Sequence, residues 1–195
     1  RPGETIKEII DRAGGLSENS YSEGAIYTRN SVAEDQKKAF ERSADQLEKT
    51  LIDTITSGEF TQLNEFSLTP ITSLITKLRN IEPLGRQIVN MDYLSIKTDP
   101  LINFEVQDGD KLYIPKRPFS ISVIGEVLNG ATLGFDPSLK VQDYIELAGG
   151  INDTADSQRI FVIYPNGQSK IYKKSLFRQK DDILPGSTIV VPRDS

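Results

Sequence analysis

Carboxylates are the side chains in this sequence best suited to acid–base chemistry, and two close pairs stand out, Asp181 with Asp182 and Asp108 with Asp110. Glycosidases use two such carboxyl groups, one as an acid and one as a nucleophile or base. All four residues lie beside predicted turns, where aspartate is favoured because its side chain bonds its own backbone. Nothing in the sequence sets either pair at a catalytic separation, so we predict that the protein is not an enzyme.

Cysteine and histidine, the other common catalytic and metal-binding residues, are missing from the sequence. Thiolate nucleophiles and Ser–His triads therefore have no basis here, and the usual zinc ligands reduce to carboxylates. Glu105, Asp108 and Asp110 do not reproduce the ligand spacing of a calcium loop. We therefore expect no metal and no cofactor.

Carbohydrate contact is the remaining chemistry for which the sequence offers candidates. Sugars present apolar C–H faces ringed by hydroxyl groups, so their sites combine flat aromatic rings with hydrogen-bonding groups. Tyr164 and Tyr172 flank a predicted hairpin, and Arg159 begins its first strand. We predict these three residues as carbohydrate contacts. The alternative is structural, because strand tyrosines commonly pack their rings and leave their hydroxyl groups in water.

Charge and hydropathy argue against two classes of partner. The formal net charge is −5, whereas nucleic-acid binding depends on a basic surface that neutralises phosphates. No stretch approaches the roughly 20 apolar residues that span a bilayer. We expect neither a nucleic-acid partner nor a membrane-spanning segment in this piece. Because the sequence starts without methionine, we interpret it as part of a longer protein.

The elements that would position these residues are repeated within the chain. The segment 5–16, TIKEIIDRAGGL, resembles the segment 140–151, KVQDYIELAGGI. Both have the i, i+3, i+4, i+7 spacing of one helical face, with matches at Ile6/Val141, Ile9/Tyr144, Ile10/Ile145 and Ala13/Ala148. Each segment then reaches Gly-Gly, which can adopt the left-handed conformation that ends a helix. We interpret them as equivalent helices of a tandem repeat.

Predicted strands follow each Gly-Gly in the same order. The first strand lies at 25–29 in one copy and at 159–164 in the other, which is rich in β-branched and aromatic residues. The returning strand lies at 85–89 and at 168–172, and Pro165-Asn166-Gly167 supplies the turn of the second hairpin. Each copy ends with a glycine turn and a closing strand stopped by proline.

A predicted helical insertion, from about Val32 to Pro83, separates the two strands of the first copy and has no counterpart in the second. Near-heptad spacing of apolar residues indicates a long amphipathic helix that ends near Gly58. Thr69-Pro70 begins a shorter helix, with proline at a favoured first position. We expect an antiparallel helical hairpin whose apolar stripe docks either on its own domain or on a neighbouring subunit.

The second copy opens with an alternating strand that ends in Gly125-Glu126-Val127. A second strand, the helix with Ala-Gly-Gly, a hairpin and the closing Pro-Gly-strand-Pro follow. This order resembles the SLBB domain (soluble ligand-binding β-grasp) over nearly all of 119–194. Tandem copies are typical of the periplasmic part of polysaccharide export proteins similar to the Wza-like capsule channels. The first copy departs from the pattern, because it lacks the opening hairpin and carries the insertion.

The resemblance implies an α+β fold of two tandem β-grasp (ubiquitin-like) SLBB units. They would occupy residues 1–117 and 118–195, with the helical insertion at about 32–83 in the first. It also implies a non-enzymatic, periplasmic module of a capsular or exopolysaccharide export protein, associated with the outer membrane through other parts of the protein.

The expected partners are a polysaccharide or oligosaccharide, further copies of the chain, and other export components. The module would serve assembly and glycan passage. The alternative is a soluble carbohydrate-binding module that acts as a sensor or carrier, with one site in each copy.

Overall fold

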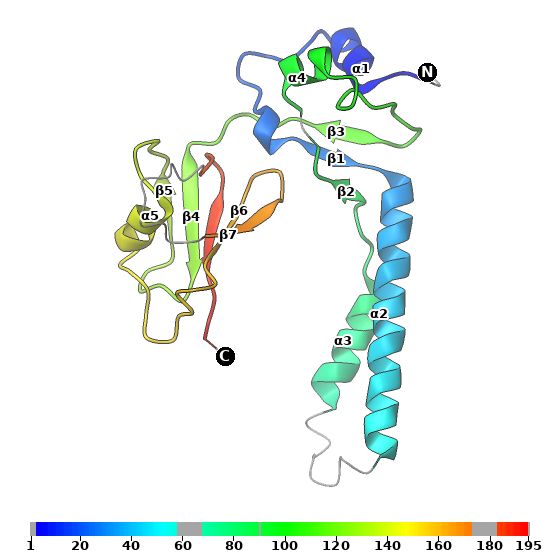
Figure 1. Cartoon of the computed structure of the whole chain (residues 1–195), viewed down its shortest axis with the longest axis vertical. Coiled ribbons are helices and arrows are strands. Elements are labelled where there is room, and N and C mark those ends of the chain that lie inside the picture. Colours follow the sequence, from blue (N-terminus) through cyan, green and yellow to red (C-terminus); the bar gives the residue numbers. More distant parts are fainter. Residues whose placement is uncertain (1–2, 58–67, 90, 173–182, 195) are drawn as a thin grey trace. The chain divides into compact units, whose positions relative to one another are not determined.

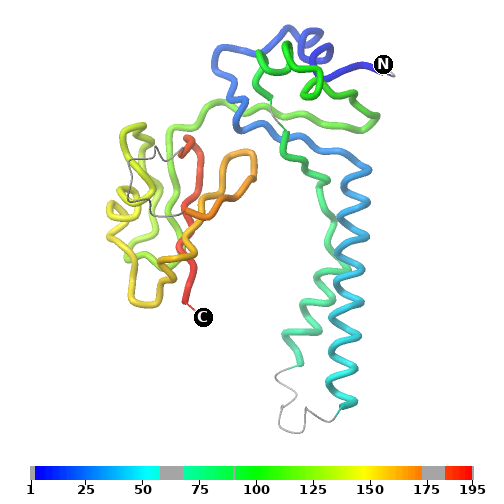
Figure 2. Tube along the Cα trace, in the orientation of Figure 1, coloured from blue at the N-terminus to red at the C-terminus, as the bar shows by residue number. Residues whose placement is uncertain are grey.

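The computed structural model describes residues 3–57, 68–89, 91–172 and 183–194 (Figures 1 and 2). Helices combine with a three-stranded and a five-stranded sheet, so the predicted α+β class is confirmed. The chain divides into two compact units. One comprises Tyr27–Gln87 and Gln107–Lys111, and the other comprises Arg1–Ile26, Ile88–Val106 and Leu112–Ser195.

The five-stranded sheet is formed by the carboxyl-terminal part of the chain. Its strands are β4 (Ser120–Gly125), β5 (Ala131–Gly134), β6 (Phe161–Ile163), β7 (Ser169–Ile171) and β8 (Thr188–Val191), in the order β5-β4-β8-β6-β7. β4 runs parallel to β8, whereas the other neighbours are antiparallel. Alternate residues of β4 and β8 are buried, and they pack with helix α5 (Val141–Leu147) in one apolar core.

Gly125 ends β4 in a conformation that only glycine adopts readily, with φ of 98°. A Cβ atom there would lie 2.0 Å from the carbonyl oxygen of Val191 in β8. The next residue, Glu126, accepts hydrogen bonds from Asn152 Nδ2 at 2.8 Å and Thr154 Oγ1 at 2.6 Å. The Gly-Glu-Val segment therefore bends the chain and ties β4 to the loop that follows α5.

The two repeated helices end as the sequence predicts. Helix α1 (Ile6–Arg12) and helix α5 each lead into two glycines with positive φ, Gly14-Gly15 and Gly149-Gly150. The amide of the second glycine donates to a carbonyl five residues earlier, Ile10 in one case and Ile145 in the other. This left-handed termination satisfies carbonyl groups that the helix end leaves open.

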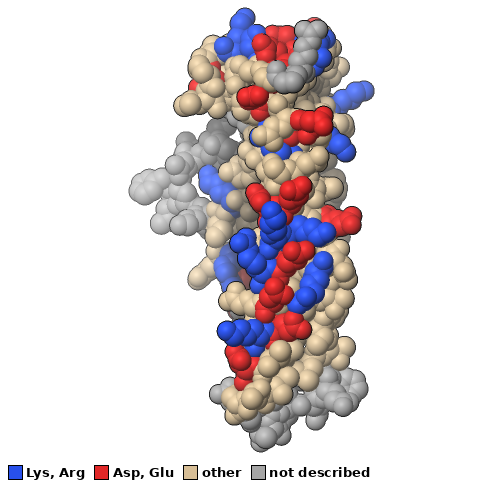
Figure 3. All heavy atoms as spheres, turned by 90° about the vertical axis from the view of Figure 1, so that its right-hand side faces the viewer, with Lys and Arg blue, Asp and Glu red and all other residues tan. Residues whose placement is uncertain are grey.

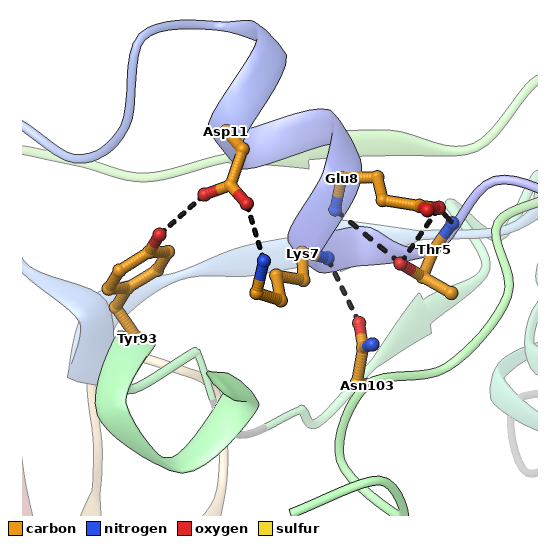
Figure 4. A network of polar contacts seen from close by, with 6 residues as sticks. All are labelled: Thr5, Lys7, Glu8, Asp11, Tyr93 and Asn103. Atoms are coloured by element: carbon orange, nitrogen blue, oxygen red, sulfur yellow. Dashed lines mark hydrogen bonds and ion pairs between the residues drawn. The ribbon is translucent and has the colours of Figure 1, made fainter. Parts of the chain in front are cut away.

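The amino-terminal part of the chain has a smaller core. The three-stranded sheet has β1 (Ile26–Thr28) between β2 (Arg86–Gln87) and β3 (Lys111–Tyr113), and the other elements are a 3₁₀ turn, η1 (Ser22–Gly24), and α4 (Tyr93–Thr98). Polar contacts join α1 to α4 and to the chain beyond it (Figure 4). The Asp11 carboxylate accepts from Lys7 Nζ at 2.6 Å and from the Tyr93 hydroxyl, and the Lys7 amide donates to Asn103 Oδ1 at 3.0 Å.

Two helices form most of the smaller unit. Helix α2 (Asn30–Thr56) begins directly after β1, and helix α3 (Thr69–Asn80) runs back along it (Figure 1). Ala44 and Ile75 are buried, whereas Ile52, Ile55 and Leu74 are largely exposed. Arg79 of α3 donates to both Asp45 and Glu48 of α2. None of the helices in the described ranges is long and apolar enough to cross a membrane.

Candidate functional site

The predicted carboxylate pairs do not form a catalytic arrangement in the described part of the chain. Asp110 is 5% exposed and lies in a buried ion pair with Arg29, whose Nη2 donates to Oδ2 at 2.8 Å and whose Nε donates to Oδ1 at 3.1 Å. The Tyr27 hydroxyl donates to the same carboxylate. Asp108 is exposed, and Asp181-Asp182 lie outside the described residues.

The hydrogen bonds around Asp110 stabilise its ionised form. Burial raises the pKa of Asp110, but hydrogen bonds from Arg29, Tyr27 and the Gln107 amide outweigh it, so the pKa lies below its usual value. Burial and the bond to Asp110 raise the pKa of Tyr27 to about 12. The carboxylate is therefore ionised and the phenol protonated at neutral pH. This network fastens the turn 107–110 to β1, next to the start of α2.

Metal binding has no support within the described ranges, where no three His, Cys, Asp or Glu side chains gather closely enough to hold an ion. Glu105 forms an isolated β-bridge with Thr5, and Asp110 is engaged by Arg29.

The predicted carbohydrate contacts lie at two ends of the β6–β7 hairpin, with Tyr164 at one end and Arg159 and Tyr172 at the other. Tyr164 follows β6 beside the turn, whereas the Tyr172 amide donates to the Ile160 carbonyl at the other end. Four residues of strand separate these ends, about 13 Å. Both tyrosines pack partly against the core of the five-stranded sheet. Arg159 is exposed and bonds to Asp156. They therefore do not form one aromatic surface, and each contact stays a prediction.

Tyr164 lines a cavity of about 760 Å³ in the larger unit. The hairpin contributes four side chains at alternate positions: Tyr164, Asn166, Gln168 and Lys170. Polar groups from other segments complete the rim: Ser20, Ser22, Glu23 and Asp92. The apolar residues of the lining are Ile88, Val89, Met91 and Leu184. The volume falls within the range of small-molecule sites, although the lining is more polar than is usual for them.

Local hydrogen bonds fix the hairpin side of the cavity. The Tyr164 amide donates to the Gln168 carbonyl at 2.7 Å, and Asn166 Oδ1 accepts from the Gln168 amide at 2.9 Å. The turn between these residues is tight, because Gly167 has φ of 88° and its amide donates to the Tyr164 carbonyl at 2.8 Å.

The remaining wall is held by the segment 115–118, which is bonded on both sides. The Pro115 carbonyl accepts from the Tyr21 amide at 2.8 Å, and the Arg117 amide donates to the Asn19 carbonyl at 3.3 Å. A Cβ atom on Gly186 would lie 2.6 Å from Pro118, so the other end of the segment packs closely on the turn before β8. This bonding sets the residues around Ser20 and Ser22 beside the hairpin.

Two carboxylates give the cavity an acidic side. Asp92 caps α4, and hydrogen bonds from the hydroxyl and amide of Ser95 lower its pKa, so it is charged at neutral pH. Glu23 is exposed on η1. The sequence prediction missed both residues, because Glu23 lies 69 positions before Asp92, and Asp92 lies 72 positions before Tyr164. Only Asp92 has a local signal, an aspartate placed to cap the residues after it.

The exposed side of α2 carries charges of both signs. Lys and Arg are interspersed with Asp and Glu along the face of the helix shown in Figure 3. Within the helix, Lys38 pairs with Asp35 at 3.9 Å. Phe40, Leu47 and Leu51 are half-buried on the helix. Such a mixed surface is typical of a solvated helix or of a polar contact between chains.

Comparison with known sequences gives this geometry a context. Residues 120–172 match the model of the SLBB domain. Two curated sequences, each named polysialic acid transport protein KpsD of Escherichia coli, are 27% identical to the chain over 190 residues. The alignments cover 97% of this chain but 32% of each relative, so the chain spans about a third of their length. The resemblance to SLBB domains of polysaccharide export proteins is thereby confirmed.

Proposed function

We propose that this chain is a non-enzymatic, periplasmic module of a capsular or exopolysaccharide export protein, in which it serves assembly and glycan passage. The observation that carries the proposal is similarity along nearly the whole chain to a protein named for polysialic acid transport. The SLBB match at 120–172 supports it independently of the helical region. The engagement of Asp110 by Arg29 argues against a hydrolytic carboxylate pair at that turn.

The proposed architecture is two β-grasp units, 1–117 and 118–195, with a helical hairpin inserted at about 32–83 in the first. The strand orders support it, because β2-β1-β3 corresponds to β7-β6-β8 of the larger sheet. In each case an antiparallel hairpin follows a helix that ends in two glycines. At the base of the insertion, the Arg29 amide donates to the Gly85 carbonyl at 3.0 Å, so a tight turn could join these strands.

Glycan contact by Arg159, Tyr164 and Tyr172 is part of the proposal, and the cavity favours Tyr164 among them. The same cavity favours the second candidate function, a carbohydrate-binding module that acts as a sensor or carrier. The two functions differ in what happens to polysaccharide in the cell, because only loss of an export component traps polymer that is still synthesised.

The test is deletion of the gene for the complete protein, followed by measurement of polysaccharide on the cell surface and inside the cell. We expect surface polysaccharide to be lost while polymer accumulates inside. The complete protein should restore export. A variant in which residues 30–84 are replaced by a short glycine-rich turn should keep the SLBB fold but restore export poorly, if the helices serve assembly.

Two results contradict the proposal. Normal surface polysaccharide in the deletion strain excludes an export role and favours the sensor. Absence of polymer from both surface and interior indicates a role in synthesis, which a non-enzymatic module does not have. Asp108→Ala changes an exposed residue on the turn 107–110, so it serves as the control for a substitution outside the helices. This variant should restore export fully.

A further inference from the structure

The cavity at the tip of the β6–β7 hairpin combines an aromatic ring with donors and acceptors that suit a polyhydroxylated ligand. Tyr164 supplies the ring, Asn166 and Gln168 supply amides, and Lys170 supplies an ammonium group. Hydroxyl groups of a sugar both donate and accept, so amides, which do the same, are suitable partners. The ring offers a flat apolar surface for the C–H face of a pyranose.

The volume limits the size of the ligand. About 760 Å³ falls within the range of ordinary ligand sites. It admits a short stretch of an oligosaccharide and leaves the rest of a longer chain in water.

The charges around the cavity distinguish neutral from acidic sugars. Glu23 and Asp92 contribute two carboxylates to the lining, and Lys170 contributes the one cation among the described lining residues. A carboxylate also accepts two hydrogen bonds from neighbouring hydroxyl groups. A neutral sugar therefore meets an exposed acceptor in Glu23, while Asp92 is already bonded to Ser95. An anionic sugar brings its own carboxylate against both like charges.

From this arrangement we infer that the cavity lined by Tyr164, Gln168, Lys170, Glu23 and Asp92 binds neutral oligosaccharide segments in preference to carboxylate-bearing ones. The inference rests on the proposed export function and narrows its substrate class. It also separates the chain from what its relatives' name says, since polysialic acid is an acidic polymer.

Binding is measured by titration calorimetry of the 195-residue chain with neutral tetramers of glucose, N-acetylglucosamine and mannose, and with an α2,8-linked tetramer of sialic acid. We expect saturable binding of at least one neutral tetramer, about tenfold tighter than that of the sialic acid tetramer at low salt. The difference should narrow at 0.5 M salt, because screening weakens repulsion between exposed charges. Glu23→Gln should strengthen binding of the acidic tetramer and leave the neutral one within about twofold.

Tyr164→Ala and Phe135→Ala form a matched pair, because both remove an aromatic ring packed on the same core while only Tyr164 lines the cavity. We expect Tyr164→Ala to weaken binding of the neutral tetramer about fivefold to tenfold, and Phe135→Ala to leave it unchanged. Gln168→Ala, at an exposed position, should weaken binding without affecting the fold. Thermal unfolding of each variant identifies any that has lost its structure.

The inference is overturned if no neutral tetramer shows saturable binding, if the acidic tetramer binds as tightly as the best neutral one, or if the Tyr164→Ala and Phe135→Ala variants bind alike while folded. Failure here together with loss of export in the deletion strain leaves the proposed function standing. Neutral-sugar binding together with normal export in the deletion strain supports the inference but contradicts the proposed export function. The chain would then be a carbohydrate-binding module without an export role.

Discussion

Asp110→Ala is the substitution whose effect follows most directly from the structure. The carboxylate accepts hydrogen bonds from the Arg29 guanidinium, the Tyr27 hydroxyl and the Gln107 amide. Removing it leaves a guanidinium that is 17% exposed without its counter-ion, and a buried phenol without its acceptor. The turn 107–110 also loses its attachment to β1.

The cost of this change can be estimated from the burial of the pair. Breaking a buried ion pair by removing one partner costs about 3–5 kcal/mol, because the other charge stays buried. Arg29 is partly reached by water, which places the expected loss at the lower end, about 3 kcal/mol. Asp108→Ala is the matched control, since it removes an exposed carboxylate from the same turn, and we expect a change below about 0.5 kcal/mol.

The assay is urea unfolding combined with amide hydrogen exchange, because a chain with two compact units need not unfold in one step. Exchange should accelerate in β1 and in the turn 107–110 of the Asp110→Ala protein, and remain unchanged in the five-stranded sheet. If Asp110→Ala and Asp108→Ala unfold within 0.5 kcal/mol of each other, at about the error of such measurements, the assignment of the buried pair is refuted.

The acid behaviour of the two proteins should differ as well. The pKa of Asp110 is lowered in the folded state, so its contribution is complete above the unfolded pKa of about 3.9 and is lost as the pH falls through the lower folded value. Wild-type protein should therefore lose stability in this acidic window more steeply than Asp110→Ala, which has no such carboxylate to protonate. Equal slopes below pH 4 would contradict the assignment.

Three further predictions rest on other parts of the structure. Gly125→Ala should destabilise the five-stranded sheet by at least about 2 kcal/mol in urea unfolding, because its Cβ would meet a β8 carbonyl, whereas Gly134→Ala has open space and should change it little. Burial raises the pKa values of Tyr21 and Tyr27 to about 12, so their stabilising contribution is complete below pH 10 and is lost as the pH rises through 12. Ultraviolet titration should show that two tyrosines ionise late, and a single ionisation step near pH 10 would contradict this. Arg79→Ala should reduce the stability of the α2–α3 pair by less than about 1 kcal/mol at low salt, because its ion pairs are exposed, and a larger loss would mean that they organise the helices.

Helices and strands with a strong local pattern could be predicted from the sequence. The repeated apolar spacing and Gly-Gly gave both α1 and α5, because a helical face and its left-handed end are encoded within a dozen residues. Helix α3 begins at Thr69, where Thr69-Pro70 predicts it. Helix α4 was missed, because its six residues are too few to show a periodic face, although Asp92 caps it through the Ser95 amide.

The candidate site could be predicted only in part, because it combines segments far apart in the sequence. The hairpin pattern located Tyr164, but the same pattern placed Tyr172 with it, and strand geometry separates the two along the hairpin. Ser20, Glu23 and Asp92 carry no pattern that relates them to the hairpin. Backbone bonds from Asn19 and Tyr21 to the segment 115–118 hold the segment of Ser20 and Glu23, and no local pattern in the sequence predicts them.

The buried polar groups explain how a sheet of three short strands holds the start of a 27-residue helix in place. Arg29 is the last residue before α2, and its side chain is held by Asp110 while its amide donates to the Gly85 carbonyl. The side chain and amide of one residue thus join the start of the helix to the turn 107–110 and to the segment before β2. Directional bonds to a buried charge therefore help to fix the base of the helix. The proposed assembly role of these helices therefore requires the Arg29–Asp110 pair intact, even though neither residue lines the cavity beside the β6–β7 hairpin.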